Sequence, residues 1–576
     1  MKWLLVKLVL IAYILSLVVF VTFFPEIGVT EEDRSDAKCK RKIDRIIQNY
    51  ELALNQTVNN LTRNRETVNS DAQIGPGAFG LDVDLTKTPM SPAERQEWER
   101  LLAQYDYDAF ISDMVSIYRV LPDNRPDVCK TKQYGNLPEV SIIIPFRDER
   151  LSVLLRTVHS ILQNTPDDLL AEIILIDDGS KTDELKSRLE VHVQSLSKVN
   201  LIRLNPSAGL MVARQTGIDR CKADYFITMD CHIEVIRGWL EPLLYRLKQN
   251  PKACLSPNVG LLKRDTFGVD FTTRWTFQRF PMFVFTLEEA HSFYKPDYLA
   301  KINRSEPLPT GINQGMVIAM KKSWFKQLGG FDTGMRVWGG EQIELSVKVW
   351  TCGGAVEIIP CSYIAHLFKT RLVWENMGLS KIINALRFAE VWMDEYKEML
   401  HQYWPTARRE IDLGPGLRER KVIRRQNRCK PFQYYIDKVK EFGLVHFPEN
   451  LRSYGWLRNE DTGFCIEKES VLGRCSMFKA AMQFFEHTEE YHIRHDGFCL
   501  FPASMANQDS PALAYDDCYV LGPQRSQWLY TMGNELLHKY TNTCLTVSTH
   551  TNIPELIFDT CAAKPNQRWT WKLWND

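Results

Sequence analysis

The first long apolar run of the chain lies at its N-terminus. Residues 3–24 read WLLVKLVLIAYILSLVVFVTFF, and Lys7 is their only charged side chain. As a helix this run would be about 33 Å long, which is enough to cross the hydrocarbon core of a bilayer. A cleaved signal peptide is the alternative, but its apolar region is usually shorter and ends in small residues. The pattern favours an uncleaved signal-anchor transmembrane helix, preceded by a cytoplasmic tail of residues 1–2.

A polar, interrupted pattern follows over residues 25–120 and is typical of a luminal stem. Its first half has apolar residues at a helical spacing but carries many charges and two sequons, so we expect a solvated spacer there. Ser91, Pro92 and Glu94 then combine an N-cap, a proline at the first helical position and a capping-box glutamate. These residues predict a short helix that continues through Tyr105.

Buried strands alternate with helical segments in residues 121–437. The runs VSIIIPF (140–146), EIILIDDGS (172–180) and DYFITMD (224–230) are rich in β-branched residues and predict buried parallel strands. Because helical patterns separate such runs, we expect a doubly wound α/β sheet. Ligands of such sheets bind at the carboxyl ends of the strands.

The last part of the chain, residues 453–576, has short strands and an internal repeat after a linker of residues 438–452. Three units open with GFC, GFC and NTC, and a second cysteine follows the first by 10, 19 and 17 positions. One such unit cannot bury much apolar surface, whereas three units stacked about an axis can. The cysteine pairs are Cys465 and Cys475, Cys499 and Cys518, and Cys544 and Cys561.

Charge and cysteine content narrow the function and the compartment. The 71 basic and 71 acidic residues cancel, which argues against a nucleic-acid binder driven by bulk charge. Several of the 14 cysteines form regularly spaced pairs, which persist in oxidising compartments. Sequons at Asn55, Asn60 and Asn303 matter only in the lumen of the secretory pathway. A single-pass protein with a luminal C-terminus is therefore expected.

Asp230 and His232 directly follow a predicted buried strand. Alternate residues of an extended segment point to the same side, so one divalent cation can contact both side chains. A carboxylate oxygen with an imidazole nitrogen suits Mn²⁺ or Zn²⁺ better than Ca²⁺. Alone, an Asp-x-His triplet is usually an ordinary surface turn, and its place after the strand favours the ligand interpretation. His366 is a candidate third ligand, although a histidine among apolar residues is more often a core residue.

Two further acidic pairs are open to two interpretations each. Asp177 and Asp178 either are helix-capping or solvated carboxylates, or accept hydrogen bonds from a nucleotide base or ribose. Glu341 and Glu344 are either solvated helix residues or face a cavity. Glycine pairs and Trp338 flank the second pair, and glycine lets a backbone approach a ligand closely, which favours a cavity for at least one glutamate.

From about residue 117 onward the chain resembles the polypeptide N-acetylgalactosaminyltransferase family. The segments that carry the resemblance are LLRTVHSIL (154–162), GWLEPLL (238–244), VWGGEQIELS (337–346), CGGAVEIIPCS (352–362) and AEVWMDEYK (389–397). The three-repeat domain is similar to the ricin-type β-trefoil lectin domain of that family. The resemblance implies a GT-A (Rossmann-like) catalytic fold and retaining transfer of GalNAc from UDP-GalNAc to Ser or Thr of secreted or membrane polypeptides.

The resemblance also implies the residues of the site. Mn²⁺ would be held by Asp230, His232 and His366, and Asp178 would meet the uridine. Trp338 and Glu341 would line the sugar site as the catalytic residues, and no enzyme nucleophile is required. Further donor contacts are expected from Ser207, Arg214, Cys231 and Lys369.

The same resemblance implies two disulfides and a subcellular location. Disulfides are implied between Cys129 and Cys361 and between Cys352 and Cys429. One helix would anchor the protein in the Golgi membrane, as a type II protein with its catalytic and lectin domains in the lumen.

The donor site departs from the family pattern at several positions. Ser207 stands in a segment where the family has an arginine, so Arg214 alone remains of that basic set. Lys369 replaces another arginine, and this exchange turns a bidentate phosphate clamp into a point charge. The loop after His366 is also shorter than in the family.

The lectin repeats depart from the family as well. Their sugar-binding aspartate is replaced by Glu467, Phe501 and Thr546 in turn. The domain is therefore either a structural trefoil with little affinity for GalNAc or one with a residual site in its first repeat. Three functions stay open: an active transferase, a pseudoenzyme that binds glycoproteins or partner transferases, and a carbohydrate-binding protein.

Overall fold

The structure is a computed structural model that describes most of the chain from residue 75 onward. The described residues are 75–572 without 86–89, 272–279, 285–286, 288–289, 304, 370–376, 404–410, 447–450, 469–470, 477–479, 496, 504–512, 523–524 and 550–553. The predicted anchor helix, most of the predicted stem and the sequons at Asn55 and Asn60 lie outside these residues. Among the helices that are described, none has both the length and the apolar character needed to cross a bilayer.

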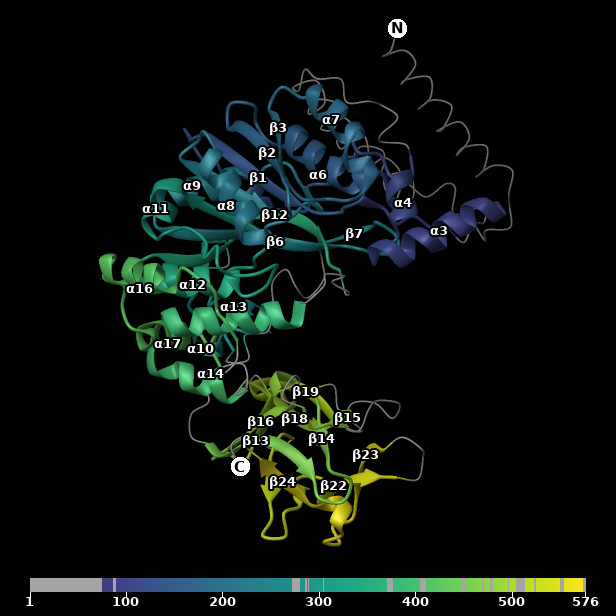
Figure 1. Ribbon diagram of the computed structural model, residues 1–576, viewed down its shortest axis with the longest axis vertical. Coiled ribbons are helices and arrows are strands. Elements are labelled where there is room, and N and C mark those ends of the chain that lie inside the picture. Colours follow the sequence, from purple (N-terminus) through teal and green to yellow (C-terminus); the bar gives the residue numbers. More distant parts are fainter. Residues whose placement is uncertain are drawn as a thin grey trace, which may run out of the picture. The chain divides into compact units, whose positions relative to one another are not determined.

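A ten-stranded mixed sheet forms the centre of the larger domain (Figure 1). Its order is β10-β12-β6-β11-β4-β1-β2-β3, with β5 beside β12 and β7 beside β6. The strands are β1 (Val140–Phe146), β2 (Leu170–Asp178), β3 (Val199–Leu204), β4 (Tyr225–Met229), β5 (Ile233–Val235), β6 (Ala253–Leu262), β7 (Val269–Asp270), β10 (Leu308–Pro309), β11 (Val317–Lys321) and β12 (Ala355–Leu367).

The first four strands are parallel, as the sequence pattern predicts. Strand β11 runs antiparallel to its neighbours β4 and β6, so the sheet is mixed. Alternate side chains of β1 enter two different cores: Ile143 lies on one side, and Ile142 and Ile144 on the other. Both faces of this strand are buried, which explains its continuous apolar run.

Helices cover the two faces of the sheet. On one side lie α6 (Leu151–Asn164) and α9 (Glu241–Gln249), whose leucines belong to the core that also contains apolar residues of β1, β2 and β6. The helices that contribute to the opposite core are α8 (Leu210–Arg220), α11 (Lys322–Gln327), α12 (Glu341–Thr351), α13 (Met377–Trp392), α14 (Lys397–Tyr403) and α17 (Phe432–Lys440). Further helices described in this domain are α5 (Asp127–Thr131), α7 (Ser187–Gln194), α10 (Pro296–Leu299) and α16 (Leu417–Gln426).

The segment before β1 also packs on the sheet. Helix α3 (Pro92–Tyr105) begins at the predicted cap, where Glu94 N donates to Ser91 Oγ and Ser91 N donates to the Glu94 carboxylate. It is followed by α4 (Ala109–Met114), and apolar residues of both helices share a core with β12. Arg119 is buried and donates to both carboxylate oxygens of Glu234 at 2.7 Å. Residues just before position 120 therefore belong to the folded domain.

Short antiparallel strands form the C-terminal domain. They are β13 (Leu451–Asn459), β14 (Phe464–Ile466), β15 (Leu472–Arg474), β16 (Phe484–Thr488), β17 (Ile493–His495), β18 (Phe498–Pro502), β19 (Leu513–Asp517), β20 (Trp528–Tyr530), β21 (Leu536–His538), β22 (Thr543–Ser548), β23 (Glu555–Asp559) and β24 (Trp569–Lys572). The repeated aromatic residues Phe485, Trp528 and Trp569 are fully buried in a single core. This common core is what a three-unit trefoil requires.

Five disulfides form among the described cysteines, and they are the same pairs as expected from the sequence and the family resemblance. They join Cys129 to Cys361, Cys352 to Cys429, Cys465 to Cys475, Cys499 to Cys518, and Cys544 to Cys561. Cys221, Cys231 and Cys254 are free thiols.

Candidate metal centre and its surroundings

Asp230, His232 and His366 meet at the carboxyl end of β4. Asp230 follows β4, His232 precedes β5, and His366 belongs to β12, which pairs with β5 so that His366 lies opposite Ile233. Asp230 Oδ2 is 3.3 Å from His366 Nε2, and the two imidazole centroids are 4.9 Å apart. One possible ligand atom of each residue lies within 4.8 Å of the others. The three predicted ligands are therefore close enough to share one cation.

The protonation states of this group also suit a cation. Burial lowers the pKa of His366, so its imidazole is neutral near pH 7, which is the form that binds metals. Burial alone would raise the pKa of Asp230, but the hydrogen bond with His366 and the charge of Arg214 lower it to about 2. His366 Nδ1 is buried and has no hydrogen-bond partner among the described residues. A carboxylate with two imidazoles is a ligand set that fits Mn²⁺ or Zn²⁺.

Arg214 on α8 connects the predicted metal ligand Asp230 with the predicted catalytic residue Glu341. Its guanidinium donates to Asp230 Oδ1 at 3.1 Å, to Glu341 Oε1 at 3.2 Å and to the Gly315 carbonyl at 2.8 Å. The Arg214 side chain is only 1% exposed. Its charge is thus already paired with two carboxylates of the protein.

Glu341 is the first residue of α12, and Trp338 lies on the turn before it. Gly339 and Gly340 have φ values of +96° and +88°, which explains the glycine pair. Gly339 N donates to Glu341 Oε2 at 3.0 Å. Asn384 of α13 donates to the carbonyls of Trp338 and Gly339, so α13 holds this turn in place.

The carboxylate of Asp178 holds the loop that leads into α8. It accepts hydrogen bonds from Ser207 Oγ at 2.8 Å and from the backbone N–H groups of Ala208 and Gly209 at 2.6 and 3.0 Å. Arg147 Nη1 in turn donates to Ser207 Oγ at 3.1 Å. Asp178 is buried, and in this structure its oxygens serve the protein's own loop.

Asp177, its neighbour, stabilises the turn after β2. Asp177 Oδ1 accepts from Ser180 N at 2.8 Å, and its other oxygen pairs with Arg203. Asp177 is thus neither a helix cap nor an open carboxylate in this structure, because its oxygens bind the turn and Arg203.

Lys369 and Cys231 both contact Glu149, a buried carboxylate that the sequence pattern did not single out. Glu149 Oε2 is 2.8 Å from Lys369 Nζ, 2.9 Å from His232 Nδ1 and 3.4 Å from Cys231 Sγ. Burial would raise the pKa of Glu149, but Lys369 and His232 hold it well below its usual range. Burial, and then Glu149, raise the pKa of the Cys231 thiol. The charged run RDER after β1 was the available signal for Glu149.

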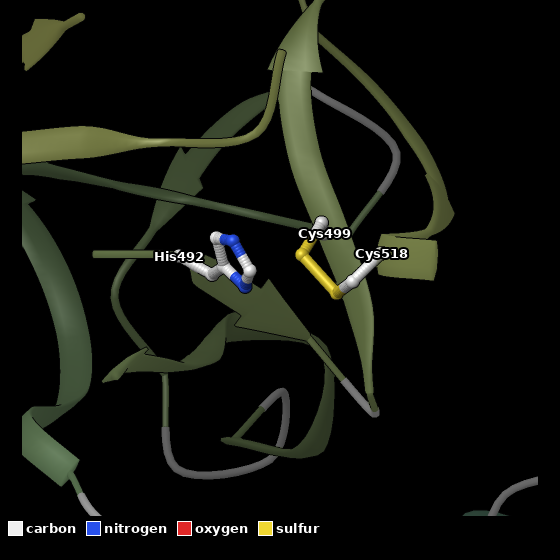
Figure 2. A group of neighbouring side chains, drawn as sticks. All are labelled: His492, Cys499 and Cys518. Atoms are coloured by element: carbon white, nitrogen blue, oxygen red, sulfur yellow. A yellow bond between two sulfur atoms is a disulfide. The ribbon is translucent and has the colours of Figure 1, made fainter. Parts of the chain in front are cut away.

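Two other groups of possible metal ligands lie in the C-terminal domain. His492 lies beside Cys499 and Cys518, but Figure 2 shows these cysteines joined as a disulfide. Glu535 likewise lies beside the disulfide between Cys544 and Cys561. Disulfide sulfurs offer no thiolate to a metal, so neither group is a candidate metal centre.

The residues at the altered lectin positions are all buried. Glu467 Oε1 accepts from Gln483 Nε2 at 3.1 Å, and Thr546 Oγ1 accepts from Gln567 Nε2 at the same distance. Phe501 at the equivalent place contributes no polar atom. The first and third repeats therefore each have a polar pair with a glutamine at this position, whereas the second has a phenylalanine.

The sequon asparagine Asn303 is exposed, and its Oδ1 accepts hydrogen bonds from the backbone N–H and the hydroxyl of Ser305. The side chain therefore lies at the surface, where a glycan would have space.

Comparison with known protein families divides the chain as the fold does. The matching models are "Glycosyl transferase family 2" over residues 141–329, "N-terminal domain of galactosyltransferase" over 304–371 and "Ricin-type beta-trefoil lectin domain" over 453–569.

Individual relatives match over most of their length. Mouse polypeptide N-acetylgalactosaminyltransferase 4 is 34% identical over 513 residues, which cover 84% of this chain and 86% of the relative. The human polypeptide N-acetylgalactosaminyltransferase 10 is 32% identical over 548 residues, covering 89% and 86%. A crystal structure of GalNAc-T7 with UDP, GalNAc and Mn²⁺ superposes with a TM-score of 0.65 at 25% identity, covering 86% of this chain and 92% of that one.

Proposed function

Because the chain belongs to the polypeptide N-acetylgalactosaminyltransferase family, we propose that it transfers GalNAc from UDP-GalNAc to Ser or Thr of polypeptides. The observation that carries the proposal is the meeting of Asp230, His232 and His366 at one point. A relative of similar fold binds UDP, GalNAc and Mn²⁺, so we take Mn²⁺ as the cation and UDP-GalNAc as the donor. Transfer with retention at the anomeric carbon follows from the family resemblance.

The residues around the triad would each have a distinct part in this reaction. Asp230, His232 and His366 would hold the cation, which when bound offsets the negative charge that gathers on the diphosphate leaving group. Arg214 keeps Asp230 and Glu341 in fixed positions on the two sides of its guanidinium. We assign the sugar to the side of Trp338 and Glu341, and the nucleoside to the strand ends near Asp178.

A second candidate function is binding without turnover, and one observation favours it. The two cations expected to meet a diphosphate already have partners within the protein: Arg214 bonds Asp230, and Lys369 bonds Glu149. A donor would have to draw at least one of them away. A pseudoenzyme that binds glycoproteins or partner transferases would not need this change.

Titration of the detergent-solubilised full chain with UDP, with and without Mn²⁺, separates the two candidates when combined with a transfer assay on a Thr-rich peptide. The proposed function predicts Mn²⁺-dependent UDP binding and transfer of GalNAc. A folded protein that shows neither activity on several peptides would be assigned the second function.

We also propose that the protein is a single-pass type II protein of the Golgi membrane, with its folded domains in the lumen. Support comes from the apolar run at residues 3–24, the sequons and the paired cysteines. Digestion of the cellular protein with an N-glycan-cleaving enzyme should increase its mobility on gels. Protease added to sealed microsomes should leave the folded domains intact, and their digestion would contradict this topology.

The lectin domain is proposed to act mainly as a structural unit. Of the three altered positions only Glu467 has a carboxylate, and it is buried against Gln483. If GalNAc binding remains, we expect it in the first repeat, and Glu467→Gln should then remove it.

A further inference from the structure

We propose that Lys369 acts as a positioning residue of the metal centre: it neutralises Glu149, which in turn fixes the orientation of the metal ligand His232. Lys369 would then not be a ligand of the donor's diphosphate. The inference rests on the proposed function only in taking the triad as a cation site.

Glu149 has partners on both of its carboxylate oxygens. The hydroxyl of Tyr107 donates to Oε1 at 2.5 Å, while His232 Nδ1 and Lys369 Nζ lie within 2.9 Å of Oε2. Glu149 is 1% exposed, so its charge has been taken out of water. Such a carboxylate is stable only with a counter-charge and hydrogen bonds, and Lys369 is the cation that contacts it directly.

The contact with His232 is where Glu149 affects the cation site. A neutral imidazole carries its proton on one nitrogen and uses the other to bind a metal. Because Glu149 accepts at Nδ1, the proton is held there and Nε2 is left free for the cation. Loss of an outer partner of this kind typically weakens metal binding about 10- to 100-fold.

The surroundings of the Lys369 ammonium favour this role over a phosphate contact. The ammonium is 2.8 Å from Glu149 Oε2 and also lies over the ring of Tyr107, 5.4 Å from its centroid. Its side chain is 23% exposed. A phosphate that bound Lys369 would share the ammonium charge with Glu149 and so weaken the neutralisation of that buried carboxylate.

The same geometry argues against a second metal ion beside Glu149. Glu149, Cys231 and His232 also have possible ligand atoms within 4.8 Å of one another. However, the Lys369 ammonium already contacts the Glu149 oxygen that such a cation would need. We infer that the ammonium takes the place of a second metal ion.

The test compares Mn²⁺ affinity in the full chain, without UDP, for Lys369→Met, Glu149→Gln and the double variant. Free Mn²⁺ is measured by electron paramagnetic resonance. We expect Lys369→Met to weaken Mn²⁺ binding about 10- to 100-fold. The double variant should recover most of the loss, because the neutral amide oxygen that Glu149→Gln introduces still accepts from His232 but needs no counter-charge. Lys326→Met, at an exposed lysine of α11, is the control and should bind Mn²⁺ normally.

Each contrary result has a defined meaning. If Lys369→Met leaves Mn²⁺ affinity unchanged and lowers only UDP affinity, Lys369 is a diphosphate ligand and the inference is wrong. It is equally wrong if the double variant is no better than Lys369→Met, or if the unsubstituted chain binds a second Mn²⁺ or Zn²⁺ that Cys231→Ser removes. Normal Mn²⁺ binding and rescue without GalNAc transfer would contradict the proposed function alone, whereas no Mn²⁺ binding by the unsubstituted chain would overturn both.

Discussion

Asp230 Oδ2 lies 3.3 Å from His366 Nε2, although the two residues are 136 positions apart in the sequence. They meet because β5 returns beside β12 immediately after the turn that follows β4. This turn is at the carboxyl end of a parallel strand, where open α/β sheets bind their ligands. The candidate metal centre is thus built by the order of strands in the sheet rather than by a local motif.

Asp230→Asn should abolish Mn²⁺ binding and lower GalNAc transfer by at least about 100-fold, if the chain is active. The amide keeps the shape of the side chain but brings no negative charge to the cation or to Arg214. The measurement is Mn²⁺ affinity together with the transfer rate. Asp219→Asn, at an exposed position of α8, is the control and should behave as the unsubstituted chain does. Retained Mn²⁺ binding in Asp230→Asn would remove Asp230 from the ligand set.

The apolar pattern was sufficient to predict the parallel part of the sheet and the trefoil core. Strands β1, β2 and β4 are buried on both faces, so each has a continuous or nearly continuous apolar run at its centre and the signal is strong. The trefoil aromatics are predictable because each repeat has to supply the same part of one core. The antiparallel β11 was not predicted, since a strand's own pattern does not specify its neighbour.

The contacts that site residues make with buried partners distant in the sequence were the hardest to predict from the sequence. Glu149 and Tyr107 hydrogen-bond each other from segments 42 positions apart, and Arg119 binds Glu234 across 115 positions. Nothing in the local pattern of a charged residue distinguishes a buried partner from a solvated one. For the same reason residues just before position 120 were included in the predicted stem, although Arg119 is buried in the folded domain.

Arg214→Met should destabilise the protein by about 3–5 kcal/mol, because it leaves Asp230 and Glu341 without their shared counter-charge in a buried site. Chemical denaturation of the full chain measures this loss. Arg100→Met, which breaks an exposed pair with Glu97 on α3, is the matched control and should cost less than about 1 kcal/mol. Equal effects of the two substitutions would show that the Arg214 pairs are screened by water.

His159 should make the folded state less stable in acid. Burial lowers the pKa of His159 to about 4, from about 6.5 in an unfolded chain. Between these values the unfolded state takes up a proton and the folded state does not, so stability falls as the pH decreases from about 6.5 to 4. The contribution of this group is on the order of 3 kcal/mol.

The measurement that checks this is the free energy of unfolding between pH 4 and 7 for the unsubstituted chain and for His159→Gln. Glutamine can still form a hydrogen bond with His192, whose ring nitrogen lies 2.7 Å from that of His159. The substituted chain should lose part of the pH dependence in this window. An unchanged slope would mean that His159 is protonated in the folded state as readily as in the unfolded one.

Gly473→Ala should destabilise the first lectin repeat by about 1–3 kcal/mol. A Cβ atom at this position would lie 1.8 Å from Glu467 Oε1, so the carboxylate would have to move and release Gln483 Nε2. The glutamate is one methylene longer than the aspartate usual in the family, and Gly473 provides the space for that extra length. Adding Glu467→Asp to Gly473→Ala should therefore recover stability, because the shorter carboxylate ends before the new methyl group. Urea denaturation of the single and double variants measures this coupling, and simple addition of the two losses would show that Gly473 and Glu467 do not constrain each other.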